Sequence, residues 1–377
     1  MNLWLLNDLA AFLLCVLCAG IVIPQILLIA FRKKLFDEPD ARKIHTLAVP
    51  RLGGLAFMPV VLFSSLLITG IDLYFGFNTL LSMMMYQARP LAFTSCSVIL
   101  MYVIGMADDL IGIKYSAKFV VQIICGIFMI AGGIWINSFH GILGLQHVSP
   151  WFGYPFTIIV IVFILNSINL IDGIDGLASG LTTIAFLIYA VAFYISGEYI
   201  YSMLSCCVMG VLVQFFYYNV FGDATKRKKI FMGDTGSLTI GMLIAFFSIR
   251  LEQLPPQSGL GYANMCAVAF VPLLIPCFDV LRVYGERILN HKNPFLPDKR
   301  HIHHKLLELG LKQRKAMVTL VLISLLFSFV NIILSMYINI NILLFGDMAI
   351  WFAAMIILNK TISARNNKQC RIQNAEC

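Results

Sequence analysis

Five aspartates next to glycine-rich, apolar sequence are the residues most able to do chemistry: Asp108, Asp109, Asp172, Asp175 and Asp234. Carboxylates are costly within membrane spans, and those found at span ends usually act on something. Each one alone would be interpreted as a helix cap or a solvated loop residue. All five are expected at one membrane face, and together they predict a site for a hard cation and phosphate groups.

Asp108 and Asp109 are neighbours in the sequence Met-Ala-Asp-Asp-Leu-Ile-Gly. Two adjacent carboxylates repel each other unless they share a cation or a hydrogen-bond donor. Neighbours on a helix point about 100° apart, so one can face a reaction while the other orients a lysine or a metal-bound water. Such a pair is a weak signal by itself.

Polar residues recur at every third position in a second stretch, as Asn166, Asn169, Asp172 and Asp175. On a regular helix a step of three drifts by about 60°, so the first and last of these would lie on opposite faces. The glycines that follow both aspartates allow the backbone to break and wrap. A broken helix end lined with amides and carboxylates is typical of a cation and phosphate site.

Asp234 lies in the sequence Phe231-Met-Gly-Asp-Thr-Gly-Ser, where it opens an apolar span. An aspartate at this position is an ordinary helix cap. It could equally be a metal ligand beside a helix N-terminus whose amides hold phosphate oxygens. Phe231 would offer a ring on which a base can stack.

Three histidines, His301, His303 and His304, follow Arg300 and precede Lys305. No cysteine or acidic partner at the usual spacing completes a tetrahedral zinc site. Histidines beside lysine and arginine bind phosphate or balance its charge. The alternative is a solvated, pH-sensitive basic loop.

The elements that must position these residues are membrane spans. The chain has 377 residues, of which 60% are hydrophobic and 12% charged, with a mean hydropathy of +0.87. These values exclude a soluble domain, a disordered chain and a disulfide-stapled secreted domain. They predict an all-α polytopic membrane protein with eleven spans, at 7–31, 52–71, 90–107, 116–136, 154–168, 178–196, 199–220, 236–251, 262–283, 316–338 and 342–358.

The basic residues predict the orientation. On these eleven spans all 27 lysines and arginines except Arg89 and Arg250 lie on one side. Cationic loops resist translocation, so this side is predicted to be cytoplasmic, with the N-terminus outside and the C-terminus inside. Anionic lipid explains the basic face better than nucleic acid does, and such a face suits an anionic substrate. Residues 1–358 are expected to form one membrane domain, and 359–377 a basic, disordered tail.

Together these motifs resemble the polyprenyl-phosphate N-acetylhexosamine-1-phosphate transferases, and within them the WecA/TagO branch that starts bacterial envelope polysaccharides. The resemblance extends from residue 37 to residue 304, in the family's order. It rests on Asp-x-Pro-x-x-Arg-Lys-x-His at 37–45, Pro-x-x-Gly-Gly at 50–54, Asp108-Asp109, Asn-x-x-Asn-x-x-Asp-Gly-x-Asp-Gly at 166–176, Phe-Met-Gly-Asp-x-Gly-Ser at 231–237 and His-Ile-His-His at 301–304.

The resemblance implies a multi-pass enzyme of the bacterial inner membrane. Undecaprenyl phosphate would attack the β-phosphorus of a UDP-N-acetylhexosamine, releasing UMP. Two anions must meet, so the reaction is expected to need Mg²⁺, with Mn²⁺ as the alternative ion. N-acetylglucosamine is the default sugar for this branch. The sequence leaves open the sugar, the downstream glycan, a homodimer, and direct transfer against a covalent aspartyl intermediate.

The same resemblance implies a role for each site residue. Mg²⁺ would be held by Asp234 and Asn169, and the lipid phosphate would be positioned or deprotonated by Asp108. Asp109, Asp172 and Asp175 would orient the metal, the sugar phosphate or basic residues. His301, His303 and His304 would be catalytic together with Asp108, Asp109, Asp172 and Asp175, and with Arg300 they would hold phosphates. The substrate-binding set would be Phe231 on uracil, Arg300, Asn166, and Arg42, Lys43 and His45 on the lipid phosphate.

Three alternatives remain. A membrane prenyltransferase also uses aspartates and Mg²⁺, but it needs two spaced aspartate-rich motifs and has no use for the histidines. A secondary transporter would favour inverted repeats and acids near the bilayer midplane. A phospho-MurNAc-pentapeptide transferase of the same family differs only in the spelling of its histidine motif.

Overall fold

The computed structural model describes residues 3–35, 49–77, 79–255, 264–291 and 300–375. Within these ranges the chain is helical and contains no strand, only an isolated bridge between Ser138 and His147. The predicted all-α class is confirmed. A bilayer favours it, because helices satisfy their own backbone hydrogen bonds where water is absent.

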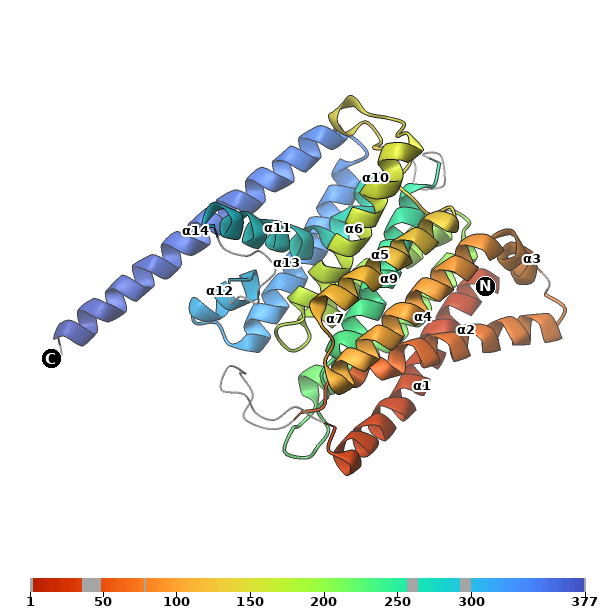
Figure 1. Cartoon of the computed structure of the whole chain (residues 1–377), viewed down its shortest axis with the longest axis horizontal. Coiled ribbons are helices and arrows are strands. Elements are labelled where there is room, and N and C mark those ends of the chain that lie inside the picture. Colours follow the sequence, from red (N-terminus) through yellow and green to blue (C-terminus); the bar gives the residue numbers. More distant parts are fainter. Residues whose placement is uncertain (1–2, 36–48, 78, 256–263, 292–299, 376–377) are drawn as a thin grey trace.

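The helices follow one another along the chain from the N-terminus to the C-terminus (Figure 1). They are α1 Leu3–Lys33, η1 Gly53–Ala56, α2 Phe57–Tyr74, α3 Thr79–Tyr86, α4 Ala88–Ile111, α5 Tyr115–Ala131, η2 Ile142–Gly144, α6 Pro150–Ile171, α7 Leu177–Ile195, α8 Tyr199–Phe216, the π-helical turn η3 Tyr217–Phe221, α9 Gly233–Glu252, α10 Met265–Phe270, η4 Val271–Leu273, α11 Leu274–Leu289, α12 Ile302–Glu308, α13 Gln313–Leu334 and α14 Ile340–Ala375.

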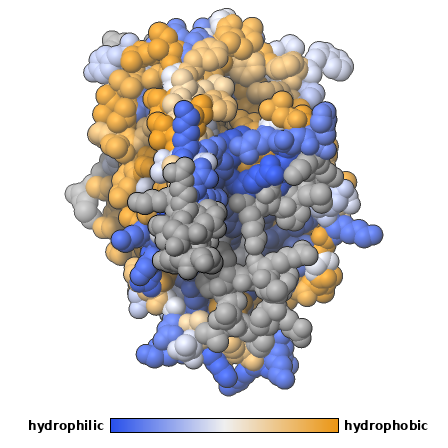
Figure 2. Space-filling view, turned by 90° about the vertical axis from the view of Figure 1, so that its left-hand side faces the viewer, coloured by the Kyte–Doolittle hydropathy of each residue, from blue (hydrophilic) through white to orange (hydrophobic). Residues whose placement is uncertain are grey.

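The described residues contain ten helical segments that are long and apolar enough to cross a membrane. The remaining predicted span, 116–136, corresponds to the shorter apolar helix α5, whose 17 residues extend over about 25 Å. Each of the eleven predicted segments therefore contains a helix. Seen from one side, hydrophobic residues dominate one half of the surface and hydrophilic residues gather towards the other (Figure 2).

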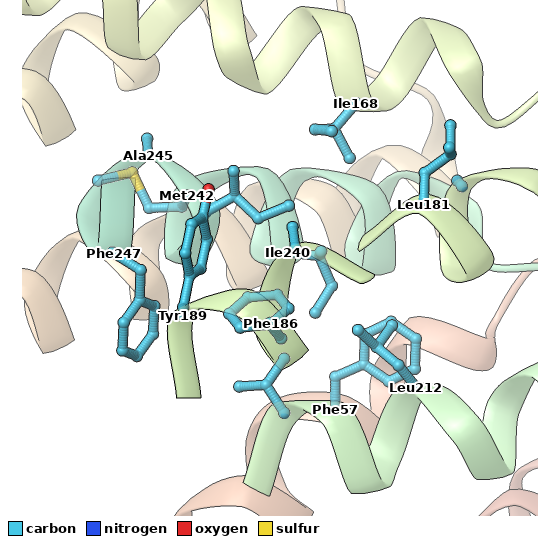
Figure 3. Close-up of a cluster of buried hydrophobic side chains, with 14 of the residues drawn as sticks. Phe57, Ile168, Leu181, Phe186, Tyr189, Leu212, Ile240, Met242, Ala245 and Phe247 are labelled. Atoms are coloured by element: carbon cyan, nitrogen blue, oxygen red, sulfur yellow. The ribbon is translucent and has the colours of Figure 1, made fainter. Parts of the chain in front are cut away.

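Helix α9 lies at the centre of the bundle, with 83% of its most apolar stretch buried. Close-packed aromatic and aliphatic side chains surround it, among them Phe186 and Tyr189 of α7 against Phe247 (Figure 3). The core places the first turn of α9 at one end of the bundle. We call this the site end, and the opposite end, near Glu252, the far end.

Two glycines let neighbouring helices approach the start of α9 closely. A Cβ atom on Gly54 would lie 2.0 Å from the backbone nitrogen of Gly236, and one on Gly105 would lie 2.6 Å from the Cα of Thr235. Lipid tails are as apolar as leucine, so contacts between membrane helices depend on such small residues. The glycines therefore bring η1 and α4 against the turn that carries Asp234.

The ninth predicted span is broken. Helix α10 gives way to the short turn η4, which contains Pro272, and α11 then leaves the bundle sideways towards α14 (Figure 1).

Helix α14 extends over about 54 Å and remains helical to Ala375, across residues for which the sequence predicted a disordered tail. Its cytoplasmic location stays a prediction.

Candidate active site

Asp109 holds the first turn of α9 in place. Its Oδ1 accepts the backbone N–H of Asp234 at 2.8 Å, and its Oδ2 accepts the N–H of Thr235 at 2.8 Å and the Thr235 hydroxyl at 2.5 Å. A helix start leaves such N–H groups without partners inside the helix. Asp109, from α4, accepts hydrogen bonds from the backbone N–H groups that were predicted to bind phosphate oxygens. It thereby fixes the position of Asp234.

Lys118 joins the other two aspartates of this end. Its ammonium lies 3.2 Å from Oδ2 of Asp108 and 2.7 Å from Oδ2 of Asp234. All three side chains keep about a fifth of their surface exposed. The second oxygen of Asp108 accepts the N–H of Ile113 at 2.7 Å. Two carboxylates from separate helices thus share one cation at a site that remains open.

Asn169 reaches the same turn from α6. Its amide donates to the hydroxyl of Ser237 at 2.8 Å, and that hydroxyl donates to the carbonyl oxygen of Gly233 at 3.1 Å. Asn166, one turn earlier, instead donates to Gln122 of α5 at 2.9 Å and to the carbonyl of Val162 at 2.7 Å. Asn169 therefore lies beside the Asp234 turn, whereas the amide donor of Asn166 links α6 to α5.

The sharp turn at 172–176 joins α6 to α7. Gly176 has φ +77°, which lets the chain reverse, and its N–H donates to the Asn219 side chain at 2.6 Å. Burial raises the pKa of Asp172 to about 7, and the negative charge of Asp234 adds to this. Asp175 forms an ion pair with Lys229 at 2.5 Å. Glycine at the turn thus allows a break in the helix, as the sequence predicted.

Phe231 is fixed through its backbone. Its N–H donates to the carbonyl of Pro50 at 2.8 Å, and its own carbonyl accepts the N–H of Gly53 at 2.9 Å. The ammonium of Lys229 lies 5.9 Å from the centre of its half-buried ring. The Pro-x-x-Gly-Gly motif therefore holds Phe231 next to the Asp175 ion pair.

The histidine motif reaches the aspartate-rich turn through His303. A Cβ atom on Gly173 would lie 2.2 Å from Nε2 of His303, so only glycine leaves room for this ring. The ring is fully buried, and neither nitrogen has a hydrogen-bond partner among the described residues. Burial, followed by the charges of His304 and His301, lowers the pKa of His303 to about 3. This low pKa favours the neutral imidazole, and the predicted contact of His303 with phosphate stays a prediction.

The other two histidines flank His303. The ring of His301 is parallel to it at 5.9 Å, and that of His304 is tilted by 47° at 4.2 Å. Nδ1 of His301 lies 2.8 Å from Oδ2 of Asp279, a buried residue of α11. The carbonyl of Arg300 accepts a hydrogen bond from Arg282 at 2.7 Å.

Several residues of this end were not among the predicted site residues: Lys118, Asn219, Ser237, Asp279 and Arg282. Only Asp279 and Arg282 could have been found from the local sequence, because an acid followed three residues later by an arginine is unusual inside an apolar segment. The other three depend on how distant helices pack. Three predicted residues, Arg42, Lys43 and His45, lie outside the described residues.

The chain is similar to a described protein family and to several known proteins. The family described as glycosyl transferase family 4 matches residues 91–252, which contain the aspartates of α4, the 172–176 turn and α9. A probable undecaprenyl-phosphate N-acetylglucosaminyl 1-phosphate transferase of Bacillus subtilis is 32% identical over 329 residues, which cover 86% of this chain and 84% of the relative.

Similar relatives occur in other bacteria. Undecaprenyl-phosphate alpha-N-acetylglucosaminyl 1-phosphate transferases of Yersinia pestis and Escherichia coli K12 are 27% and 26% identical, over 81% of this chain and 78% of each relative. The chain therefore belongs to glycosyl transferase family 4, among the polyprenyl-phosphate N-acetylhexosamine-1-phosphate transferases whose motifs it carries.

Proposed function

We propose that this enzyme transfers N-acetylglucosamine 1-phosphate from UDP-N-acetylglucosamine to undecaprenyl phosphate and releases UMP. The observation that carries the proposal is the meeting of α4, α6 and α9 at the site end. There Asp108 and Asp234 share Lys118, and Asn169 contacts the first turn of α9, which carries Asp234. The names of the relatives above contain the transferred group, N-acetylglucosaminyl 1-phosphate, and the lipid, undecaprenyl phosphate.

Mg²⁺, or Mn²⁺ in its place, would be held by Asp234 and Asn169. Within the described residues no three His, Cys, Asp or Glu side chains are grouped to hold a metal alone. Mg²⁺ suits such a sparse set, because it keeps waters and takes phosphate oxygens as further ligands. The ammonium between Asp108 and Asp234 supports this assignment, since it indicates a position where the protein favours positive charge. A bound ion would neutralise the diphosphate.

Asp108 is the residue that we assign to the lipid phosphate. One of its oxygens is held by the N–H of Ile113, and the other contacts Lys118, which can itself attract a phosphate. Asp109 is a positioning residue in this proposal, because its oxygens hold the backbone of α9. Phe231 and Lys229 would face the uridine, beside Asp175.

The polyprenyl tail would lie along α11. A cavity of about 410 Å³ is lined mainly by apolar side chains, including Phe156 and Val160 of α6 and Phe278 and Leu281 of α11. Leu281 is 55% exposed at its edge, so a chain could enter from the bilayer. Asp279, which contacts His301, lies on the same helix next to Phe278.

The test is an assay of UMP release by purified protein in detergent with undecaprenyl phosphate and Mg²⁺. UDP-N-acetylglucosamine, UDP-N-acetylgalactosamine and UDP-MurNAc-pentapeptide would be supplied in parallel. We expect UMP from the first alone, and none after a chelator is added. UMP from the pentapeptide substrate would identify the other branch of the family, and absence of UMP in every well would reject the proposed reaction.

A further inference from the structure

We propose that Asp279 of α11 is a positioning residue for the transfer, because it fixes the proton of His301 and the start of α12. Its hydrogen-bond partners are His301 and Ile302 of the histidine motif and Arg282 of α11. The inference rests on the proposed function for its kinetic consequences, whereas the arrangement of His301 can be measured without any turnover.

Asp279 is a fully buried carboxylate with a donor on each side. Its Oδ1 accepts from Nη2 of Arg282 at 2.6 Å and from the N–H of Ile302 at 3.0 Å. Its Oδ2 lies 2.8 Å from Nδ1 of His301 and 3.1 Å from the same N–H of Ile302. One side chain thus ties α11 to the first residues of α12.

These contacts determine which nitrogen of His301 carries its proton. Arginine and a backbone N–H can only donate, and a guanidinium keeps its charge in proteins. The carboxylate of Asp279 therefore accepts from all its partners, and Nδ1 of His301 must be a donor. Nε2 is then the nitrogen that remains for a contact with a substrate phosphate. In other histidine–carboxylate pairs the carboxylate sets the tautomer in the same way.

The same carboxylate places His303. Helix α12 has only seven residues, which is too short to be stable without tertiary contacts. Its first N–H, on Ile302, is held by Asp279, and Arg282 holds the carbonyl of Arg300 just before it. Since the ring of His303 fits against Gly173 with no spare room, a shift at the start of α12 would move it off the aspartate-rich turn.

Asp279→Asn is the informative substitution. It keeps the shape of the side chain but leaves one oxygen in place of two. That oxygen is needed by the two obligate donors, Arg282 and the N–H of Ile302, so the amide nitrogen faces Nδ1 of His301 and cannot accept its proton. Arg282 would still pair with Glu286, which it contacts at 2.8 Å, so we expect the variant to fold. We expect kcat/KM to fall about 10–100-fold, as for other residues that orient a functional histidine.

Asp72→Asn is the matched control. Asp72 is also a buried carboxylate, at 5% exposed, and it accepts a hydrogen bond from Asn7 at 2.7 Å near the far end. We expect its kcat/KM to stay within about twofold of wild type. An equal loss in both variants would show that any buried aspartate gives the same effect, and it would overturn the proposal.

A double-mutant cycle tests whether Asp279 acts through His301. If it does, adding Asp279→Asn to His301→Ala should change kcat/KM by no more than about twofold. The partner is already gone, and the amide oxygen of the new side chain still accepts the N–H of Ile302, which keeps the start of α12 in place. Independent effects, in which the two losses multiply, would overturn the positioning role.

Nuclear magnetic resonance of ¹⁵N-histidine-labelled protein separates this inference from the proposed function. We expect a protected Nδ1–H signal that disappears in His301→Ala and in Asp279→Asn, whether or not wild type releases UMP. Absence of that signal in wild type, or its persistence in Asp279→Asn, would overturn the inference. Failure of the UMP assay with this signal intact would reject the proposed reaction alone.

Discussion

The two ends of α9 both carry charged side chains inside the bundle, but they use them differently. At the far end each carboxylate has its own donor: Arg250 pairs with Glu198 at 2.7 Å, and His140 with Glu252 at 2.9 Å. At the site end two carboxylates share one lysine. The charges around Arg250 and His140 are therefore paired one to one, whereas there is more acid than base around Lys118.

Exposure separates the two ends less sharply. The side chain of Glu252 is fully buried, but those of Glu198 and Arg250 keep 23% and 16% of their surface exposed, close to the 25% and 22% of Asp234 and Lys118. The site end also contains His303, a buried imidazole with no hydrogen-bond partner in the described part of the chain. A buried polar group without a partner costs stability. Nε of Arg250 and Oε2 of Glu252, at the far end, are also buried without a partner among the described residues. The difference between the two ends is therefore the lysine that two carboxylates share, and not burial.

The largest expected effect comes from Asp234→Asn. The substitution removes the charge that we assign to Mg²⁺ but keeps the backbone contact with Asp109, so the protein should fold. We expect UMP release to fall at least about 100-fold, with little change in Tm in detergent. Turnover near the wild-type rate would remove Asp234 as a metal ligand and erase the contrast between the two ends.

Lys118→Met should come next. Without the ammonium, Asp108 and Asp234 repel each other, and a divalent ion is the remaining cation that can relieve them. We expect turnover to fall about tenfold or more. We also expect Mg²⁺ to raise the Tm of the variant by more than that of wild type, since a ligand of the folded state stabilises it. An equal Mg²⁺ shift in both proteins would contradict a shared cation site.

Gly54→Ala tests the packing that positions the site end. The new Cβ would lie 2.0 Å from the backbone of Gly236, so η1 and α9 must separate. We expect a lower Tm and a severalfold loss of turnover. Gly70→Ala is the matched control, because it lies in the same span with nothing within 4 Å of its Cβ. Equal Tm values for the two variants would rule out the close contact.

The smallest effect concerns pH at the far end. The hydrogen bond to Glu252 raises the pKa of His140 above its ordinary value. The stabilisation is therefore fully present below the unfolded pKa of about 6.5 and is lost as pH rises through the folded pKa. We expect the Tm difference between wild type and His140→Gln, about 1 °C, to shrink from pH 6 to pH 9. A difference that grows with pH would contradict this pairing.

The sequence predicts the helices well because span length and apolar runs are local properties. It also placed Asp108, Asn169 and Asp234 at helix ends, where the structure has them. It could not predict that Asp109 would be used to hold the backbone of α9, because that depends on how closely Gly105 lets α4 approach. Nor could it place Lys118, because the direction of this side chain is set by the packing of α5 on α4. The low pKa of His303 could not be predicted either, since it follows from burial.

Whether the site end transfers a sugar 1-phosphate is best decided by following the β-phosphorus of the donor. UDP-N-acetylglucosamine labelled with ³²P at the β position would be incubated with the enzyme, undecaprenyl phosphate and Mg²⁺, and the lipid and aqueous phases separated. Transfer of sugar 1-phosphate predicts label in the lipid phase and unlabelled UMP in water. Labelled UDP in the aqueous phase would mean that the sugar alone is transferred, and would contradict the proposed reaction.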